Sequence, residues 1–193
     1  MFLNKIALLT QIIASIQKIS DANSKRLCSV ARFKKMEKGD ILVHQSSENH
    51  SEYFLLNGKS RNLIRDAMGR EVTLGFTNGL GIVPPNIART RDGISLVEIE
   101  VLAKSDIAII DSNKLMELMV ADEEIRDWGN MVMRQELQRM MAREWSLAAL
   151  SAHEKLEWFR SDFPDGEATF SHVHIASYLG ITPVTLSRAR TRG

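Results

Sequence analysis

The segment 172–191, HVHIASYLGITPVTLSRART, restricts the fold of this chain more than any other part. Two helices that cross closely need a small residue at the crossing, and Ala176 supplies one. Four residues later, Gly180 can adopt the positive φ that a tight interhelical turn requires. Thr182 followed by Pro183 is a favourable N-cap and first residue for a second helix. The pattern therefore predicts a helix-turn-helix.

The remaining apolar residues of this segment lie where the small core of such a motif needs them. They are Ile175, Leu179, Ile181, Leu186 and Ala189. An ordinary helical hairpin is the alternative interpretation, because it also needs amphipathic helices. The coincidence of small, turn-forming, capping and apolar positions favours the helix-turn-helix.

A helix-turn-helix places its second helix in the major groove of DNA. Arg188 lies on the outer face of that helix, and an arginine fork matches the O6 and N7 atoms of guanine. Val184 can contact a thymine methyl group, whereas hydroxyl and further basic side chains suit phosphates. The predicted DNA-binding residues are Thr182, Pro183, Val184, Thr185, Ser187, Arg188 and Arg190, with Arg192 adding charge. For each of these residues considered singly, the alternative to a DNA contact is an ordinary solvated surface position.

The distribution of charge supports this interpretation better than its total does. Lys and Arg number 25 against 24 Asp and Glu, so the net charge of +1 does not indicate an anionic partner. From Ala168 to Gly193, however, there is no carboxylate, and three arginines crowd the end. Such a local excess favours contact with nucleic acid, although arginines near a terminus are also common in solvated tails.

The first 31 residues have a helical pattern. Their apolar residues recur at helical spacing, and Thr10 and Gln11 interrupt any continuous apolar run. We therefore interpret the start of the chain as an amphipathic helix that packs on the body, and not as a signal peptide. The residues expected on its apolar face are Leu3, Ile6, Leu9, Ile13 and Ile16. No segment is long enough to cross a membrane, so no membrane contact is expected.

Short β-like runs separated by turn residues follow, from Arg32 to Asp111. Turns are expected at Gly39, Gly58, Gly69, Gly79 and Gly93, and strands at Ile41–Val43, Tyr53–Leu56, Glu71–Leu74 and Val97–Val101. In the last of these, Glu98 and Glu100 alternate with apolar residues, which predicts a strand with one solvated side. Strands at intervals of about ten residues indicate a sandwich or barrel.

Beyond Asp111 the pattern becomes helical. Ser112 is expected to cap a short helix that ends near Met119, and a long helix is expected from Asp122 to about Trp145. The apolar groups of the long helix are too many for an exposed helix. They either face the β domain alone or also form a dimer seam, for which the candidates are Ile125, Trp128, Val132, Leu137 and Met140. Ser151 with Glu154 forms a capping box that opens a further helix, and 161–170 is expected to be a loop.

This order of elements, together with IASYLGITPVTLSRAR, resembles the Crp/Fnr family of bacterial transcription regulators. The segments GDILVHQ, YFLLNGKSRNLI and GREVTLGF are similar to the family's cyclic-nucleotide-binding β-roll, and LSAHEKLEWF to the start of its DNA-binding domain. The resemblance covers nearly the whole chain. It implies an α+β fold with an antiparallel β-roll (a double-stranded β-helix) in 1–121, a long dimerisation helix in 122–150 and a winged-helix-type helix-turn-helix in 151–193. It also implies a homodimer that reads a near-palindromic site.

The chain departs from the family at two places. Relatives that bind cyclic AMP carry a Gly-Glu pair for the ribose and an Arg-Ser or Arg-Thr pair for the phosphate. Here Gly81 is followed by Ile82, and Ser95 and Leu96 precede the alternating strand. The ligand-binding residues are therefore unknown, and we hypothesise that cyclic AMP is not the effector.

The second departure is in the recognition helix. Pro183 and Val184 replace the charged base-reading residues of better-known members, so the family's familiar operator cannot be assumed.

Other functions remain as alternatives. A cupin-type metalloenzyme would need a His-x-His and further ligands inside the barrel, but the β region contains only His44 and His50. A haem sensor has no supporting motif, and the single Cys28 excludes a four-cysteine iron–sulfur cluster and fits a reducing cytoplasm. A β-roll module with little DNA affinity is the third alternative.

No catalytic residues, metal ligands or cofactors are predicted. The expected partners are double-stranded DNA and a second copy of the chain, with RNA polymerase and an unidentified small-molecule effector as further candidates.

Overall fold

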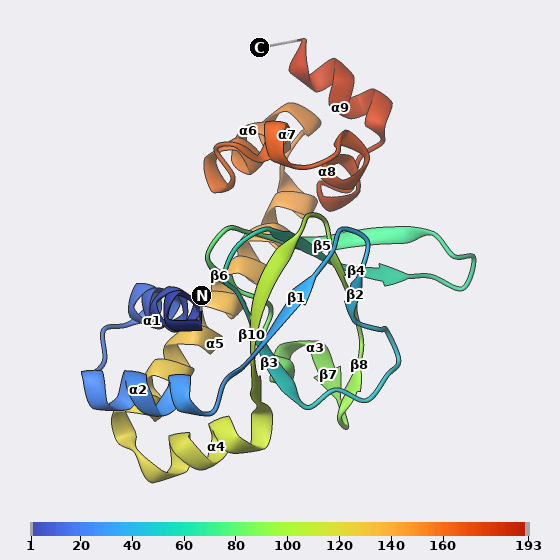
Figure 1. Ribbon diagram of the computed structural model, residues 1–193. Helices are drawn as coiled ribbons and strands as arrows, with labels where there is room; N and C mark the ends of the chain where they lie inside the picture. Colours follow the sequence, from blue (N-terminus) through green and yellow to red (C-terminus); the bar gives the residue numbers. More distant parts are fainter. Residues whose placement is uncertain (1, 192–193) are drawn as a thin grey trace. The chain divides into compact units, whose positions relative to one another are not determined.

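The computed structural model describes residues 2–191, which form two compact units (Figure 1). The first, here called the N-terminal unit, contains the chain up to Leu63 together with Phe76–Glu136. The second, the C-terminal unit, contains Ile64–Gly75 and the chain from Leu137 onward. The sequence analysis predicted different domain boundaries, at 121/122 and 150/151. The difference arises because the long helix α5 (Glu123–Ala149) contributes its first half to one unit and its second half to the other.

In the N-terminal unit, two helices precede the strands, one short helix lies between the sixth and seventh strands, and two further helices follow the last strand. The helices are α1 (Phe2–Ile16), α2 (Asp21–Ser29), α3 (Asn86–Arg89), α4 (Ser112–Ala121) and the first half of α5. The strands are β1 (Arg32–Met36), β2 (Ile41–Val43), β3 (Ser51–Leu55), β4 (Lys59–Arg65), β5 (Glu71–Asn78), β6 (Gly81–Ile82), β7 (Thr90–Arg91), β8 (Ile94–Ser95), β9 (Glu98–Val101) and β10 (Ser105–Asp111). No helix in residues 2–191 combines the length and the apolar character that crossing a membrane would take.

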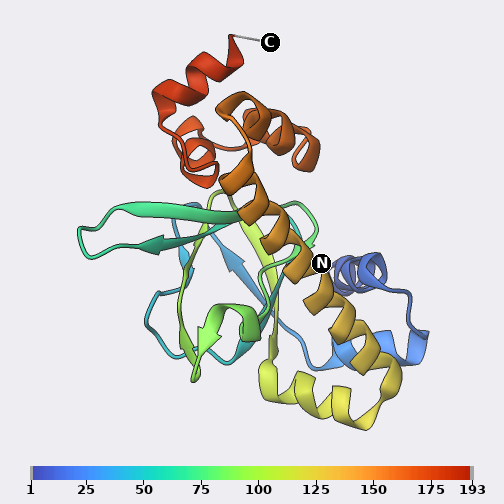
Figure 2. The same ribbon diagram turned by 180° about the vertical axis from the view of Figure 1, so that it is seen from behind.

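The strands form two four-stranded sheets and a small hairpin (Figure 2). The first sheet has the order β1-β10-β3-β6, the second β2-β9-β4-β5, and β7 pairs with β8. The paired strands run antiparallel, with β10 in register between Arg32–Met36 on one side and Ser51–Leu55 on the other. This arrangement confirms the predicted antiparallel β-roll.

The core of this unit lies between the first sheet and the helices α1, α2 and α5. Trp128 of α5 is its largest fully buried side chain. The indole nitrogen of Trp128 donates a hydrogen bond of 3.0 Å to the Ile13 carbonyl, and its ring stacks on Phe54 at 6.5 Å between centroids. The buried members from the other elements include Leu9, Leu27, Leu56, Ala108 and Ile110.

Gly58, in the turn between β3 and β4, shows why the predicted turns need glycine. Its φ is +88°, and a Cβ there would lie 2.0 Å from the Ser105 hydroxyl oxygen and 2.7 Å from the Lys104 carbonyl. Any side chain would therefore meet both backbone strain and a steric clash.

Several local expectations need correction. Leu3 is 82% exposed and does not join the apolar face of α1. Ser112 is the first residue of α4, because the Asp111 carboxylate caps this helix by accepting from the Asn113 and Lys114 amides. The side of β9 that was expected to be solvated is covered, since Glu98 is buried and Glu100 pairs with Arg61 of β4 at 2.6 Å.

The C-terminal unit contains the second half of α5 followed by α6 (Ala152–Asp162), α7 (Gly166–Thr169), α8 (His172–Tyr178) and α9 (Pro183–Arg190). The predicted capping box is present at Ser151 and Glu154. The segment expected to be a loop contains the short helix α7. Within residues 2–191 no strand follows α9, so the described part of the predicted winged-helix-type domain is helical.

Candidate nucleic-acid interface

The helices α8 and α9 form the two-helix corner that the sequence predicted. Ile175, Ala176 and Leu179 on the first helix are fully buried, as are Leu186 and most of Ala189 on the second. The side chains of Ser171 and Thr182 cap α8 and α9 by accepting hydrogen bonds from backbone amides in the first turns. The corner is therefore fixed by its own apolar contacts and caps.

Gly180 makes the turn possible. Its φ is +64°, and a Cβ there would lie 3.0 Å from the Leu147 side chain. The amide of Ile181 donates to the Ala176 carbonyl at 3.0 Å, which closes the end of α8 in the manner of a Schellman motif. The chain then enters α9 through the Thr182–Pro183 pair.

Below the corner lies an aromatic cluster that sequence reasoning missed. Phe159, Phe163 and Tyr178 pack with ring centroids between 5.2 and 6.2 Å apart. Phe170 packs edge-on against Phe163 at 6.0 Å, and Trp158 stacks on Tyr178 at 5.8 Å. These rings come from α6, α8 and the loops between them, so helical periodicity alone gives no signal for their convergence.

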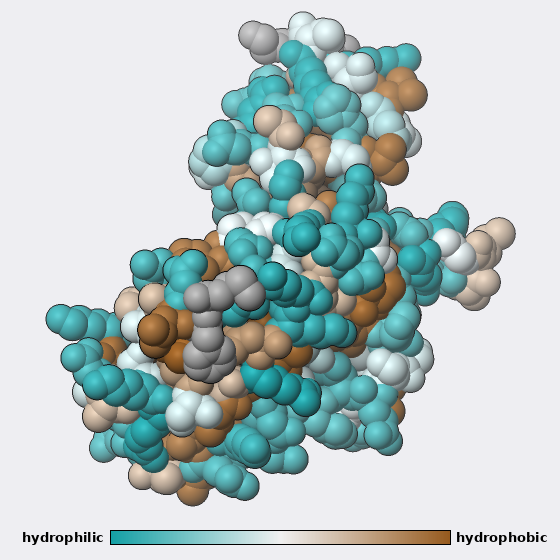
Figure 3. All heavy atoms as spheres, in the orientation of Figure 1, coloured by the Kyte–Doolittle hydropathy of each residue, from teal (hydrophilic) through white to brown (hydrophobic). Residues whose placement is uncertain are grey.

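The outer face of α9 is open to solvent. Thr182, Pro183, Val184, Ser187 and Arg188 are all exposed, and Val184 exposes 60% of its surface. The space-filling view shows a largely hydrophilic surface over the C-terminal helices, interrupted by a few hydrophobic residues (Figure 3). This face therefore has the short polar and apolar side chains that approach a groove closely.

The predicted DNA-binding residues differ in how freely they can reach a ligand. The side chain of Arg188 makes no hydrogen bond or ion pair with the part of the chain that the structure describes. The Thr182 and Thr185 hydroxyls lie 2.9 Å apart at the start of α9, where Thr182 also caps the helix. Arg192 lies outside the described residues.

Arg190 is held inside the unit. Its Nε donates to Glu167 at 2.5 Å, and its Nη1 lies 2.9 Å from the His172 ring. The other oxygen of Glu167 accepts from Arg160 at 2.6 Å. Burial opposes ionisation of this carboxyl, but the hydrogen bonds and charges of the two arginines outweigh it and hold the pKa of Glu167 below its ordinary value. Arg190 therefore ties α9 to α7, and its contact with a DNA phosphate stays a prediction.

The outer half of the β4–β5 hairpin, Ile64–Gly75, belongs to the C-terminal unit, and Thr73 of β5 contacts α8. The amide of Thr73 donates to the Ser177 hydroxyl at 2.9 Å. Arg143 of α5 donates to the carbonyls of Thr73 and Tyr178, each at 3.2 Å, while its guanidinium lies over the Tyr178 ring at 5.1 Å. Sequence reasoning missed this clamp, because its members are far apart along the chain.

The candidates for the dimer seam separate into two groups. Ile125 and Trp128 are 0% and 1% exposed in the core of the N-terminal unit, and Val132 packs against that core. Ile125 and Trp128 therefore face the core of their own unit, as in the alternative in which the apolar groups of the helix pack on the β domain. Leu137 and Met140, by contrast, are 57% and 50% exposed. Two further residues of α5 that were not among the candidates, Met141 and Trp145, are exposed to a similar degree.

Two arginines, Arg89 and Arg91, lie near the segment in which the phosphate-binding pair of the family was expected. Arg89 is 2% exposed and donates to the Pro84 carbonyl, to the Asn49 side chain and to the Ser51 carbonyl. Arg91 is exposed on β7. Among residues 2–191, no three His, Cys, Asp or Glu side chains lie together as metal ligands.

No protein-family model and no curated protein matches the chain. Solved structures do resemble it. FixK2 from Bradyrhizobium japonicum aligns with a TM-score of 0.73 at 19% identity over 84% of each chain. The c-di-GMP-responsive global regulator CLP of Xanthomonas campestris gives 0.71 at 13% identity, covering 90% of this chain and 91% of its own. A CooA variant from Carboxydothermus hydrogenoformans gives 0.69 at 18% identity, covering 95% and 83%.

The chain therefore has the fold of Crp/Fnr-family regulators, with the cyclic-nucleotide-binding-like β-roll of that family. Two of the structures that it resembles, CLP and a Crp/Fnr-family protein from Eubacterium rectale, are described as regulators.

The Glu167 clamp leads to a pH-dependent prediction. Replacing Glu167 with Gln removes the charge that holds Arg160 and Arg190, and we expect a loss of about 1 kcal/mol in unfolding free energy at neutral pH. Because the folded pKa lies below the unfolded one, this contribution is complete above the unfolded value of about 4.3 and is lost as the pH falls through the folded pKa. Urea denaturation of both proteins at neutral and acidic pH measures the difference.

The control is Glu157→Gln, which removes a 53% exposed partner of Arg160 alone. It should cost less than Glu167→Gln at neutral pH. An equal cost, or a Glu167→Gln effect that does not shrink in acid, would contradict the clamp.

Proposed function

We propose that the chain is a DNA-binding transcription regulator of the Crp/Fnr type that acts as a homodimer on a near-palindromic site. The observation that carries the proposal is the exposed face of α9, held on a rigid corner with the Arg188 side chain unengaged. A preorganised helix with a free arginine fork can read a guanine in the major groove, while Ser187 and the start of the helix lie against phosphates. The likeness of the whole fold to known regulators supports the same function.

Arg188→Ala tests base reading. Binding sites are first located by footprinting on genomic DNA fragments, and affinities are then measured for a located site and for random DNA at one salt concentration. We expect the substitution to weaken the located site by about tenfold or more, since a bidentate arginine–guanine contact contributes roughly 1–3 kcal/mol of discrimination. Random DNA should lose far less.

Arg188→Lys is the matched control, because it keeps the charge and loses the fork. It should retain affinity for random DNA and still lose affinity for the located site. An equal loss of affinity for both kinds of DNA in Arg188→Ala would refute the base-reading role.

The second half of α5 is the proposed dimer seam. Leu137, Met141 and Trp145 follow at intervals of four residues, with Met140 beside them, so they form one stripe on a helix. Each exposes half of its surface or more. A stripe of this kind is typical of a helix that pairs with a second copy.

The double substitution Leu137→Glu and Met141→Glu should convert a dimer into a monomer, because two carboxylates per copy would face each other in the seam. Sedimentation equilibrium measures the mass. Met68→Glu, at an 80% exposed position in the hairpin tip, is the control and should leave the dimer intact. A wild-type chain that sediments as a monomer at micromolar concentration would exclude the seam.

We also propose that cyclic AMP is not the effector. A cyclic phosphodiester needs a free cation, and the donors of Arg89 are already bonded to Pro84, Asn49 and Ser51. Isothermal titration calorimetry with cyclic AMP should show no saturable heat at micromolar concentration. Micromolar affinity would overturn this part of the proposal.

A β-roll regulatory module with little DNA affinity is the second candidate. It is favoured by the uncharged first turn of α9, where Pro183 and Val184 are exposed, and by the engagement of Arg190 with Glu167. Binding to genomic fragments that strengthens steeply as salt is lowered separates the regulator from this module.

A further inference from the structure

A cavity of about 600 Å³ lies within the N-terminal unit, between β3, α3, α4 and the first half of α5. This volume is in the range of about 300–1,000 Å³ that is usual for small-molecule sites. Its apolar lining includes Phe54, Ile82, Met116, Met119, Trp128 and Met133. All of the residues that line it belong to this one unit.

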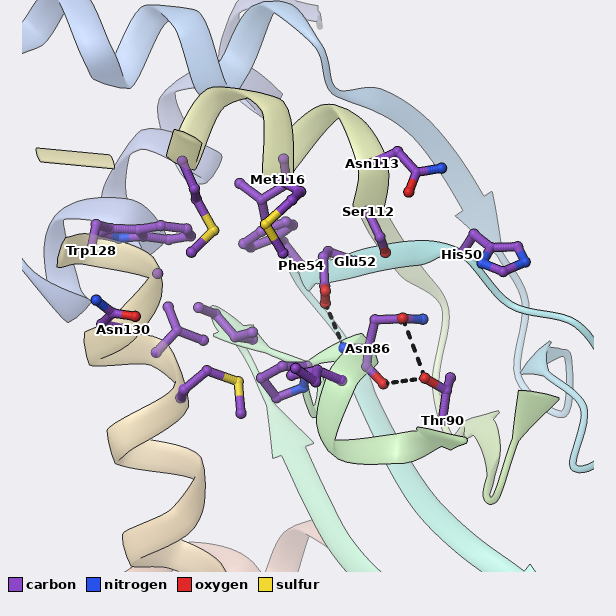
Figure 4. Close-up of a pocket in the computed structure, with 18 of the residues that line it drawn as sticks. His50, Glu52, Phe54, Asn86, Thr90, Ser112, Asn113, Met116, Trp128 and Asn130 are labelled. Atoms are coloured by element: carbon purple, nitrogen blue, oxygen red, sulfur yellow. Dashed lines mark hydrogen bonds between the residues drawn. The ribbon is translucent and has the colours of Figure 1, made fainter. Parts of the chain in front are cut away.

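Two polar groups in the cavity have unused hydrogen-bonding capacity. Glu52 and Ser112 extend into the space enclosed by α3, α4 and α5 (Figure 4). Glu52 accepts from the Asn86 amide through Oε2 at 2.8 Å, while Oε1 has no partner within residues 2–191. The hydroxyl oxygen of Ser112 is buried and also lacks a partner in the described chain. A buried polar atom is normally paired, so the Ser112 hydroxyl indicates a ligand that supplies a hydrogen-bonding group, and Oε1 of Glu52 can accept a further hydrogen bond from it.

The charges around the cavity indicate which ligand it can accept. An anion would meet the carboxylates of Glu52 and Asp92 and no free guanidinium, because the donors of Arg89 are bonded to the protein. A cation would meet Glu52 under the opposing influence of the positive charge of Arg89, which acts on the same carboxyl. Burial raises the pKa of Glu52, although the Asn86 amide and the charge of Arg89 oppose this. A neutral hydrogen-bond donor avoids both charge conflicts.

We propose that this cavity binds an uncharged, largely apolar small molecule that donates one hydrogen bond to Oε1 of Glu52. The apolar body lies against Trp128, Met119 and Met133, and the polar end lies between Glu52 and Ser112. This inference goes beyond the proposed function, since binding here requires neither DNA nor a second copy of the chain.

The probe is N-phenyl-1-naphthylamine, a neutral aromatic amine with one N–H donor whose fluorescence rises in an apolar site. The full chain should bind it saturably with one site per chain. Its sulfonated relative, 1-anilinonaphthalene-8-sulfonate, should bind about tenfold more weakly or worse, because its charge finds no cation. 1-Phenoxynaphthalene has the same shape without the N–H, and it should compete several-fold less well than the amine competes with itself.

Met116→Glu places a carboxylate at the mouth of the cavity and should weaken the neutral probe about tenfold. Val120→Glu, on the same helix but outside the cavity and 75% exposed, is the matched control and should leave binding unchanged. Ile87→Glu, at a 69% exposed lining residue, repeats the test should Met116→Glu fail to fold. No saturable binding, equal binding of the sulfonate, equal competition by the ether, or equal effects of the cavity and control variants would each overturn the proposal.

Discussion

The burial of Trp128 is the interaction on which the N-terminal unit depends. Its ring fills the space between Phe54 and α1, and its N–H is satisfied by the Ile13 carbonyl, so a large apolar group is buried at no cost in unpaired polar atoms. This fixes the first half of α5 in the N-terminal core. The helix has 27 residues, and its second half supplies Arg143 and Leu147 to the C-terminal unit.

The sequence predicted local features well where one short segment contains the whole cause. The Ala176–Gly180–Thr182 pattern defines a corner, and Ser151 with Glu154 defines a helix start, because capping and turn chemistry act within a few residues. The internal contacts of individual side chains could not be predicted where the cause is non-local. Arg190 was expected on DNA and Trp128 at a dimer seam, but Glu167 and the α1 core, 23 and 115 residues away respectively, decide where they lie.

The arginines illustrate why a local excess of positive charge is a weak guide to function. Arg89, Arg143 and Arg190 direct their donors to backbone carbonyls or to Glu167, and burial lowers the pKa of the first two without removing the need for partners. They therefore hold the fold together. Arg188 differs because it is exposed on α9 and its side chain makes no hydrogen bond or ion pair with the residues that the structure describes. Freedom from internal partners, rather than position in a basic tail, distinguishes the candidate reader of DNA.

The same reasoning supports the proposal that cyclic AMP is not the effector. An anionic ligand requires a guanidinium that can turn its donors to the ligand, whereas each of the three nitrogens of the buried Arg89 already donates to an oxygen of the protein. The atoms without a partner in the described chain are Oε1 of Glu52 and the hydroxyl oxygen of Ser112, and both residues line an apolar cavity. A fold built around such groups selects for a neutral donor on an apolar body. Because Trp128 lines that cavity, a ligand there would touch the residue that anchors α5, the element shared by both units.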